Sequence, residues 1–339
     1  MGVRYCTREE VLSALDDSAR SSASVDRACE SASRAVEHLT HRRFYPEIAT
    51  KYYDWPNQQH SSSYRLWLDD DLLSATSITA GGALLTNYFL EPANDGPPYN
   101  CLETNLSSSS VFGSGSTHQR AIAITGSWGA DDTQVPAGAT AEALDDVETE
   151  IDITNGAVVD VGDLLLIDTE RLLVTERTWL TSGQTGSLTA DKAAVTLAVS
   201  SGAAFNVGER LLIDAEELLI TAVAGNNLVV KRAQAGTVLA VHSTATVYTS
   251  RTLTVARGVL GTTAATHLTA AAITRLDPPA EAREYALALA INRVLQEAGG
   301  YSQSTGSGET KADAVGGGLD ALRRQCYDSL ARKARSRAV

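Results

Sequence analysis

Residues 150–276 contain an internal repeat, and this repeat limits the possible folds more than any other feature of the chain. The segment 156–175 matches the segment 202–221 without a gap, at a constant offset of 46 residues. A second pair, 228–242 and 253–267, matches at a constant offset of 25 residues. Both front halves precede both back halves, whereas tandem duplication would alternate them. We therefore predict that one β module is inserted into another. The inner module would comprise 195–249, and the outer module 150–178 plus 251–276.

Each front half of the repeat carries the signals of a β-hairpin, in which an apolar run is followed by Asp-x-Glu and a second apolar run. The carboxylates of this motif, Asp168 with Glu170 and Asp214 with Glu216, could serve acid–base chemistry or bind calcium. No glycine-spaced calcium loop accompanies them, so a turn is the simpler interpretation. The Arg and His residues that recur in the back halves are interpreted as structural, because they recur with the fold.

The N-terminal region predicts two helices. Thr7 and Glu10 fit a capping box, in which each side chain bonds the main chain of the other residue. From Ser24 onward, apolar residues recur at spacings of three and four up to about Thr40. Such spacing places them on one side of a helix.

The C-terminal region also predicts two helices. The prolines after Asp277 suit the first turn of a helix that runs to about residue 298. The last helix, about 319–334, has an apolar side and a basic side. The residues expected to face inward are Leu319, Leu322, Cys326 and Leu330. The residues expected to face outward are Arg323, Arg324, Arg332 and Lys333.

Seven of the nineteen aromatic residues lie between Phe44 and Trp67. Such a cluster is typical of the core of a small β domain or of an interface that needs large rigid side chains. After Pro46 the pattern changes to short strands separated by turns, which end with a strand over 121–128. Residues 130–150 resemble a linker.

The aromatic blocks and several later segments, among them Tyr88-Phe89-Leu90-Glu91-Pro92 and 121–129, resemble the N-terminal half of the head-to-tail adaptor (connector) proteins of long-tailed double-stranded DNA bacteriophages. The resemblance covers about 1–135 and, more loosely, the C-terminal helices, whereas 140–276 departs from it as an insertion. It implies a structural protein of the virion neck that is assembled in the host cytoplasm. It also implies a ring, a dodecamer in that family, which joins the portal protein to a stopper or tail-completion protein. Genomic DNA would pass through this ring without sequence-specific binding.

If the resemblance holds, large and basic side chains are candidates for contacts between subunits or with the portal. These candidate interface residues are Arg42, Arg43, Phe44, Tyr45, Tyr52, Tyr53, Trp55, Trp67, Arg323, Arg324, Arg332 and Lys333. The alternative function is a tail-fibre or capsid-surface module whose nested β repeat binds a host glycan or protein. The repeat contains few aromatic residues for stacking on sugars, which counts against a glycan.

Composition argues against several other functions. The formal net charge is −13, whereas proteins that grip duplex DNA are usually basic. The four cysteines are scattered, which indicates free thiols rather than disulfides or a zinc site. The sequence shows none of the common catalytic or nucleotide-binding motifs, so we expect no enzyme, no cofactor and no metal. No apolar run is long enough to span a bilayer, and the N-terminus lacks the apolar region of a secretory signal.

Together these patterns predict an α+β fold in three parts. The expected parts are a discontinuous helical domain from 1–45 plus 278–339, which the resemblance implies forms the ring, a small β domain of 46–135 with the aromatic blocks, and an inserted β region of 140–276 made of the two nested modules.

Overall fold

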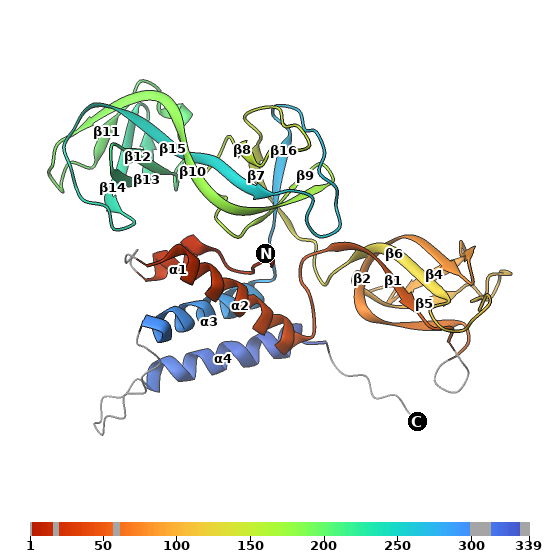
Figure 1. The fold of residues 1–339 in the computed structure, drawn as a ribbon. Coiled ribbons are helices and arrows are strands. Elements are labelled where there is room, and N and C mark those ends of the chain that lie inside the picture. Colours follow the sequence, from red (N-terminus) through yellow and green to blue (C-terminus); the bar gives the residue numbers. More distant parts are fainter. Residues whose placement is uncertain (1, 16–19, 57–61, 299–312, 333–339) are drawn as a thin grey trace.

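The structure is a computed structural model of the 339-residue chain, and it describes residues 2–15, 20–56, 62–298 and 313–332. The fold is mostly β, with 40% of residues in strands and 20% in helices. Among the described residues, two large antiparallel sheets account for the strands, and four helices lie beside them (Figure 1). The predicted α+β fold, a discontinuous helical domain carrying a small β domain, is therefore wrong. The error arose because strands in the repeat are far longer than the short pieces expected, and β10 alone spans 19 residues.

The four helices pack against one another and share one apolar cluster (Figure 1). They are α1 (Arg8–Ala14), α2 (Ser22–Thr40), α3 (Ala280–Ala298) and α4 (Asp313–Leu330). Thr7 caps α1 in the predicted capping box with Glu10. Val25 and Val36 lie on the buried side of α2, which follows the predicted spacing. The left-handed conformation of His41 ends α2 and turns the chain toward the first sheet.

The first sheet has the strand order β1-β6-β2-β5-β4, with β3 paired to β2, and every pairing is antiparallel. Its strands are β1 (Glu47–Tyr53), β2 (Arg65–Ala80), β3 (Ala83–Leu84), β4 (Tyr88–Glu91), β5 (Tyr99–Thr104) and β6 (Ile122–Trp128). Leu72, Leu102 and Ile124 lie at the centre of its apolar core. Strands β1 and β4 form the two edges of this sheet.

The second sheet has the order β11-β14-β13-β12-β15-β10-β9-β16-β7, with β8 paired to β15. Its strands are β7 (Gln134–Ala139), β8 (Glu150–Asp152), β9 (Leu164–Ile167), β10 (Glu170–Leu188), β11 (Thr196–Ala198), β12 (Arg210–Ile213), β13 (Glu216–Ala224), β14 (Asn227–Gln234), β15 (His242–Ala256) and β16 (Ala272–Leu276). Strand β7 occupies part of the segment that the sequence indicated as a linker. The Asp-x-Glu motifs join β9 to β10 and β12 to β13 as the predicted hairpins.

The long strands β10 and β15 run side by side through two separate apolar clusters (Figure 1). In one cluster, which we call the outer module, Ile151 and Leu172 from the front half of the repeat pack with Leu253 from the back half. In the other, the inner module, Leu211 packs with Val247. This is the packing that insertion of one module into the other requires. The domain boundaries remain a prediction.

Within the part of the chain that the structure describes, no helix is long and apolar enough to cross a membrane.

Candidate functional site

The first aromatic block joins the helices to the first sheet from the inside of the molecule. Phe44 and Tyr45 are buried and contact the ring of Tyr5, at centroid distances of 5.5 and 5.2 Å. The Tyr5 hydroxyl donates to Glu37 at 2.7 Å and accepts the main-chain N–H of Phe44 at 3.1 Å. The hydroxyl of Tyr45 donates to the carbonyl of Arg4 at 2.9 Å. Phe44 and Tyr45 therefore belong to the core, the first of the two uses that the sequence left open.

The second and third aromatic blocks divide between the core and the surface. Tyr53 is buried, with its ring centroid 6.3 Å from that of Trp128. Trp55 and Trp67 are half-buried, and the Trp55 indole N–H donates to the carbonyl of Phe112. Tyr52, in contrast, is 62% exposed on the edge strand β1. Of the aromatic candidates, Tyr52 is the one that a partner can reach most freely.

Arg42 and Arg43 lie at the point where α2 passes into β1. Arg42 is paired with the buried Asp71 at 3.2 Å, and Arg43 with Glu47 at 2.9 Å on the surface. Burial raises the pKa of Asp71, although Arg42 opposes the shift. Arg43 is thus the more accessible of the two arginines.

The basic residues of α4 also divide into two groups. Arg323 and Arg324 are exposed, as predicted, while Cys326 is buried and Leu319, Leu322 and Leu330 pack beside it. Arg332 differs from the prediction of an outward-facing side chain. Its main-chain N–H donates to Thr40 at 2.9 Å and its guanidinium to the carbonyl of Leu68 at 2.8 Å, so it ties the end of α4 to α2 and β2. Lys333 lies outside the described residues.

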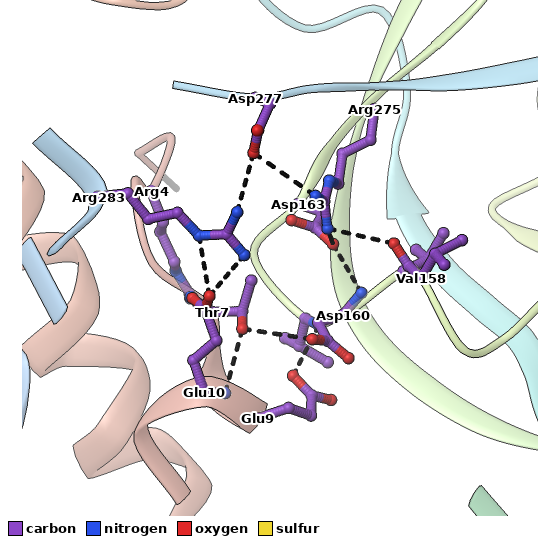
Figure 2. A network of polar contacts seen from close by, with 12 residues as sticks. Arg4, Thr7, Glu9, Glu10, Val158, Asp160, Asp163, Arg275, Asp277 and Arg283 are labelled. Carbon is purple, nitrogen blue, oxygen red and sulfur yellow. Dashed lines mark hydrogen bonds and ion pairs between the residues drawn. The ribbon is translucent and has the colours of Figure 1, made fainter. Parts of the chain in front are cut away.

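A polar cluster lies where α1 meets the outer module (Figure 2). We call Glu9, Asp160, Asp163 and Arg177 the α1 joint. Glu9 accepts the main-chain N–H of Val161 at 2.9 Å, and Asp163 accepts that of Asp160 at 2.7 Å. Arg177 lies 3.1 Å from Asp160 and 3.7 Å from Glu9.

The carboxyls of the α1 joint have unusual proton affinities. Burial raises the pKa of Glu9 to about 7, and the neighbouring Asp160 adds to the shift. Burial, followed by Asp160, raises the pKa of Asp163 to about 8. Burial also raises the pKa of Asp160 itself. The nearest cation to Asp163 is Arg275, at 3.8 Å, which is too distant for a direct hydrogen bond. At neutral pH Asp163, and Glu9 in part, therefore retain a proton that an ordinary surface carboxyl would have lost.

The same corner of the inner module is built differently. Glu209 stands where the outer module has Asp163, and Asn206 stands where it has Asp160. Glu209 accepts two hydrogen bonds from Arg251, at 2.6 and 2.8 Å, and the main-chain N–H of Gly156 at 2.9 Å. The Glu209 carboxylate is thus hydrogen-bonded to an arginine, whereas Arg275 lies too far from Asp163 for such a bond.

A second polar network occurs once in each module. In the outer module, Glu170 accepts two hydrogen bonds from Arg257, at 2.7 and 2.8 Å. His267 lies between Glu170 and Asp168, with its ring nitrogens 2.9 and 2.8 Å from the two carboxylates. Burial of Glu170 opposes its ionisation, but the bonds from Arg257 and His267 lower its pKa to about 2.

The inner module repeats this network with Glu216, Arg232, His242 and Asp214 at the corresponding distances. Both carboxylates beside each His ring are acceptors, so a doubly protonated ring satisfies both contacts. The networks attach the loop before β16 and the loop between β14 and β15 to the Asp-x-Glu turns. The turns themselves were predicted. The contacts that the Arg and His side chains make with these turns were not predicted, because the contacting residues lie up to 99 positions apart in the sequence.

Within the described ranges, no group of three or more His, Cys, Asp or Glu side chains is arranged to hold a metal ion. The two Glu–Arg–His networks fix loops, and the α1 joint holds α1 against the outer module. The accessible features are instead apolar or basic: Tyr52, Phe89, Arg43, Arg323 and Arg324.

No family model, no curated protein and no solved structure matches this chain.

Proposed function

We propose that the protein is a structural subunit of the virion neck, a head-to-tail adaptor that forms a ring beneath the portal of a long-tailed bacteriophage. The ring would join the portal to the stopper or tail-completion protein and surround the passage for genomic DNA. Its assembly would take place in the host cytoplasm. We propose no catalytic role, since the acids and bases of the two Glu–Arg–His networks bond one another.

One observation carries this proposal more than the others. Large side chains are exposed at opposite edges of the first sheet, in the segments that resemble the adaptors: Tyr52 is 62% exposed on β1 and Phe89 53% on β4. A ring subunit needs two different surfaces, because each copy meets its two neighbours in a head-to-tail manner. The two sheet edges supply such a pair.

The charges suit a neck protein as well. A net charge of −13 opposes adsorption of DNA to the wall of a channel. The exposed side of α4 carries Arg323 and Arg324 together with Asp320 and Asp328. We propose the two neighbouring arginines as contacts for an acidic surface of the portal protein.

A second candidate function is supported by the inner module. Val238 and Val241, in the loop before β15, are 80% and 64% exposed. They favour a module at the capsid or tail-fibre surface that binds a host protein. Aliphatic side chains of this kind do not stack on sugar rings, so the observation does not favour a glycan.

The test is electron microscopy of the purified protein, alone and mixed with the portal protein, together with native mass measurement. Closed rings that seat on the portal are expected. A stable monomer or trimer that ignores the portal would reject the adaptor function and favour the surface-binding module.

A further inference from the structure

Each edge of the first sheet has an open stretch, and the geometry of the two stretches matches. We propose that neighbouring copies of this chain join edge to edge, with β4 of one copy paired in parallel to β1 of the next. This proposal rests on the proposed ring, for which it names the contact between subunits. It follows from strand direction, from the orientation of main-chain groups and from the exposed side chains.

On the β1 edge, the main-chain groups that face away from the sheet can be identified from one hydrogen bond. The N–H of Ile48 donates to the carbonyl of Leu260 in the outer module at 2.9 Å, so Ile48 points away from β6. In an antiparallel ladder the direction alternates, and the register between β1 and β6 has no shift. Thr50 and Tyr52 therefore also direct their N–H and C=O groups outward. No partner for these groups occurs among the described residues.

On the β4 edge, the same reasoning selects different residues. The N–H of Asn105 donates to the carbonyl of Asn87 at 3.1 Å, so Asn87 faces β5. Phe89 then also faces β5, while Tyr88 and Leu90 direct their main-chain groups outward. Each edge thus presents two residues with unpaired N–H and C=O groups, within the part of the chain described.

Strand directions decide how the two edges can meet. Four antiparallel steps separate β1 from β4, so the two strands run in the same direction within one sheet. The rotation that relates neighbours in a ring can preserve this direction, so that β4 of one copy lies parallel to β1 of the next. Such a contact is heterologous, and it closes into a ring if the rotation per copy is correct.

The faces of the sheet agree with this pairing. In a parallel pair, a residue that bonds the partner strand lies opposite a residue that does not. Thr50 or Tyr52 of one copy would therefore lie opposite Phe89 of the next copy. The side chain of Phe89 lies on the same face of the sheet as that of Glu103, its neighbour on β5. Tyr52 and Phe89 are both solvent-exposed, on the face away from the core residue Leu102. An antiparallel contact would instead pair Thr50 with Leu90, which faces the core, and would place the cores on opposite sides.

Aromatic side chains then cover the junction. In either register, Phe89 of one copy lies directly opposite or diagonal to Tyr52 of its neighbour, within about 5–8 Å between Cβ atoms. Ile48 extends the same exposed row along β1. An open edge with exposed apolar residues is otherwise a site of uncontrolled aggregation, and the pairing covers it.

Cross-linking between proteins that each carry one introduced cysteine tests the contact. All four native cysteines are buried, so Tyr52→Cys and Phe89→Cys each introduce one accessible thiol. Under conditions of assembly, a short bis-maleimide should link a mixture of the two proteins into covalent dimers, and neither protein alone. The double variant should give a ladder of higher species. Cross-links of Tyr52→Cys with itself, at the yield of the mixture, would overturn the proposal in favour of a two-fold contact.

Proline substitution provides an independent test. Thr50→Pro removes an outward N–H and leaves the bonds to β6 intact, which edge strands tolerate. It should abolish assembly while the unfolding midpoint stays near that of Thr50→Val, the control that retains the N–H and should assemble normally. Assembly by both variants would overturn the proposal.

The outcomes separate this contact from the proposed function. Rings that form without a cross-link between positions 52 and 89 would overturn the edge contact and leave the adaptor function standing. A cross-linked ladder of open chains that does not seat on the portal would support the contact and reject the adaptor function. A protein that stays monomeric with and without the portal would overturn both.

Discussion

Replacement of Asp163 by asparagine is expected to stabilise the protein at neutral pH. Burial and the neighbouring Asp160 raise the pKa of Asp163 to about 8, so folding near pH 7 forces this carboxyl to bind a proton. One pKa unit corresponds to about 1.4 kcal/mol, and the interval from an ordinary Asp pKa near 3.9 to pH 7 sets an upper limit of about 4 kcal/mol. Asp160 shares this titration, so we expect Asp163→Asn to recover about 1–3 kcal/mol of unfolding free energy. An amide can still accept the N–H of Asp160.

The pH dependence of this effect has a definite sign. Below about pH 4 the carboxyl is protonated in both the folded and the unfolded chain, so Asp163 carries no ionisation cost and the gap between wild type and variant is smallest. Between about pH 4 and pH 8 the unfolded chain releases the proton and the folded chain retains it. The wild type therefore loses stability relative to Asp163→Asn across this range, and the gap is constant above it.

The inner module supplies the matched control. Glu209→Gln makes the same chemical change at the corresponding position, where the carboxylate holds Arg251 by two hydrogen bonds. It should destabilise the protein by about 2–4 kcal/mol, since Arg251 loses its charged partner. Urea unfolding from pH 4 to pH 8 measures both effects, and hydrogen exchange of the 160–176 and 207–222 segments assigns each to its module. Loss of stability in Asp163→Asn at pH 7, or a gap that does not change with pH, would refute the reasoning.

Three further predictions use features of the described structure. Ala233 adopts a left-handed φ of 54° where the outer module has Gly258 at 61°, so Ala233→Gly should raise the unfolding free energy by about 0.5–1 kcal/mol and Gly258→Ala should lower it; equal signs for the two would contradict this. Tyr5→Phe removes a hydroxyl that both donates and accepts within the core, and calorimetry should show a loss of about 1–3 kcal/mol. Val238→Thr with Val241→Thr should leave the thermal midpoint unchanged, because both side chains are exposed, but should weaken any partner contact of the inner module in a pull-down with neck or capsid proteins.

The sequence predicted local elements well where neighbouring residues determine them. The Thr7 and Glu10 capping box and the buried side of α4 depend on residues within a few turns of one another. Strand length was predicted poorly, because nothing near Leu188 in the sequence shows that β10 continues as one strand through two cores. This is why the predicted fold class was wrong although the repeat was visible.

The candidate site shows the same limit. Sequence alone could not separate Tyr53, which the core buries, from its neighbour Tyr52, which lies exposed. Alternation along β1 is the signal that distinguishes such residues, and it becomes decisive only once the strand and its neighbour are known. The pKa of Glu9 is raised first by burial and then by Asp160, a residue of the repeat that no local pattern connects to α1.

The duplication makes each module a reference for the other. Glu170 and Glu216, with their Arg and His partners, occupy corresponding positions and make the same contacts, so the fold itself requires them. Asp160 differs from its counterpart Asn206 and contacts residues on both sides of the joint: Thr7 at the start of α1, at 3.5 Å, and Arg177 in the outer module, at 3.1 Å.

The loop 236–242 also differs from its counterpart in the outer module, because it is more apolar. It has Val238 and Val241 where the outer module has Thr263 and Thr266, and the valines are 80% and 64% exposed. The packing of the two modules does not explain why valines replace threonines here. Arg232 and His242, which flank the loop, make the same contacts as their counterparts in the outer module. Exposed apolar residues at a position where the same fold accepts polar ones stabilise nothing within the chain. In addition to the edges of the first sheet, we therefore propose this loop as the part of the insertion that contacts a partner.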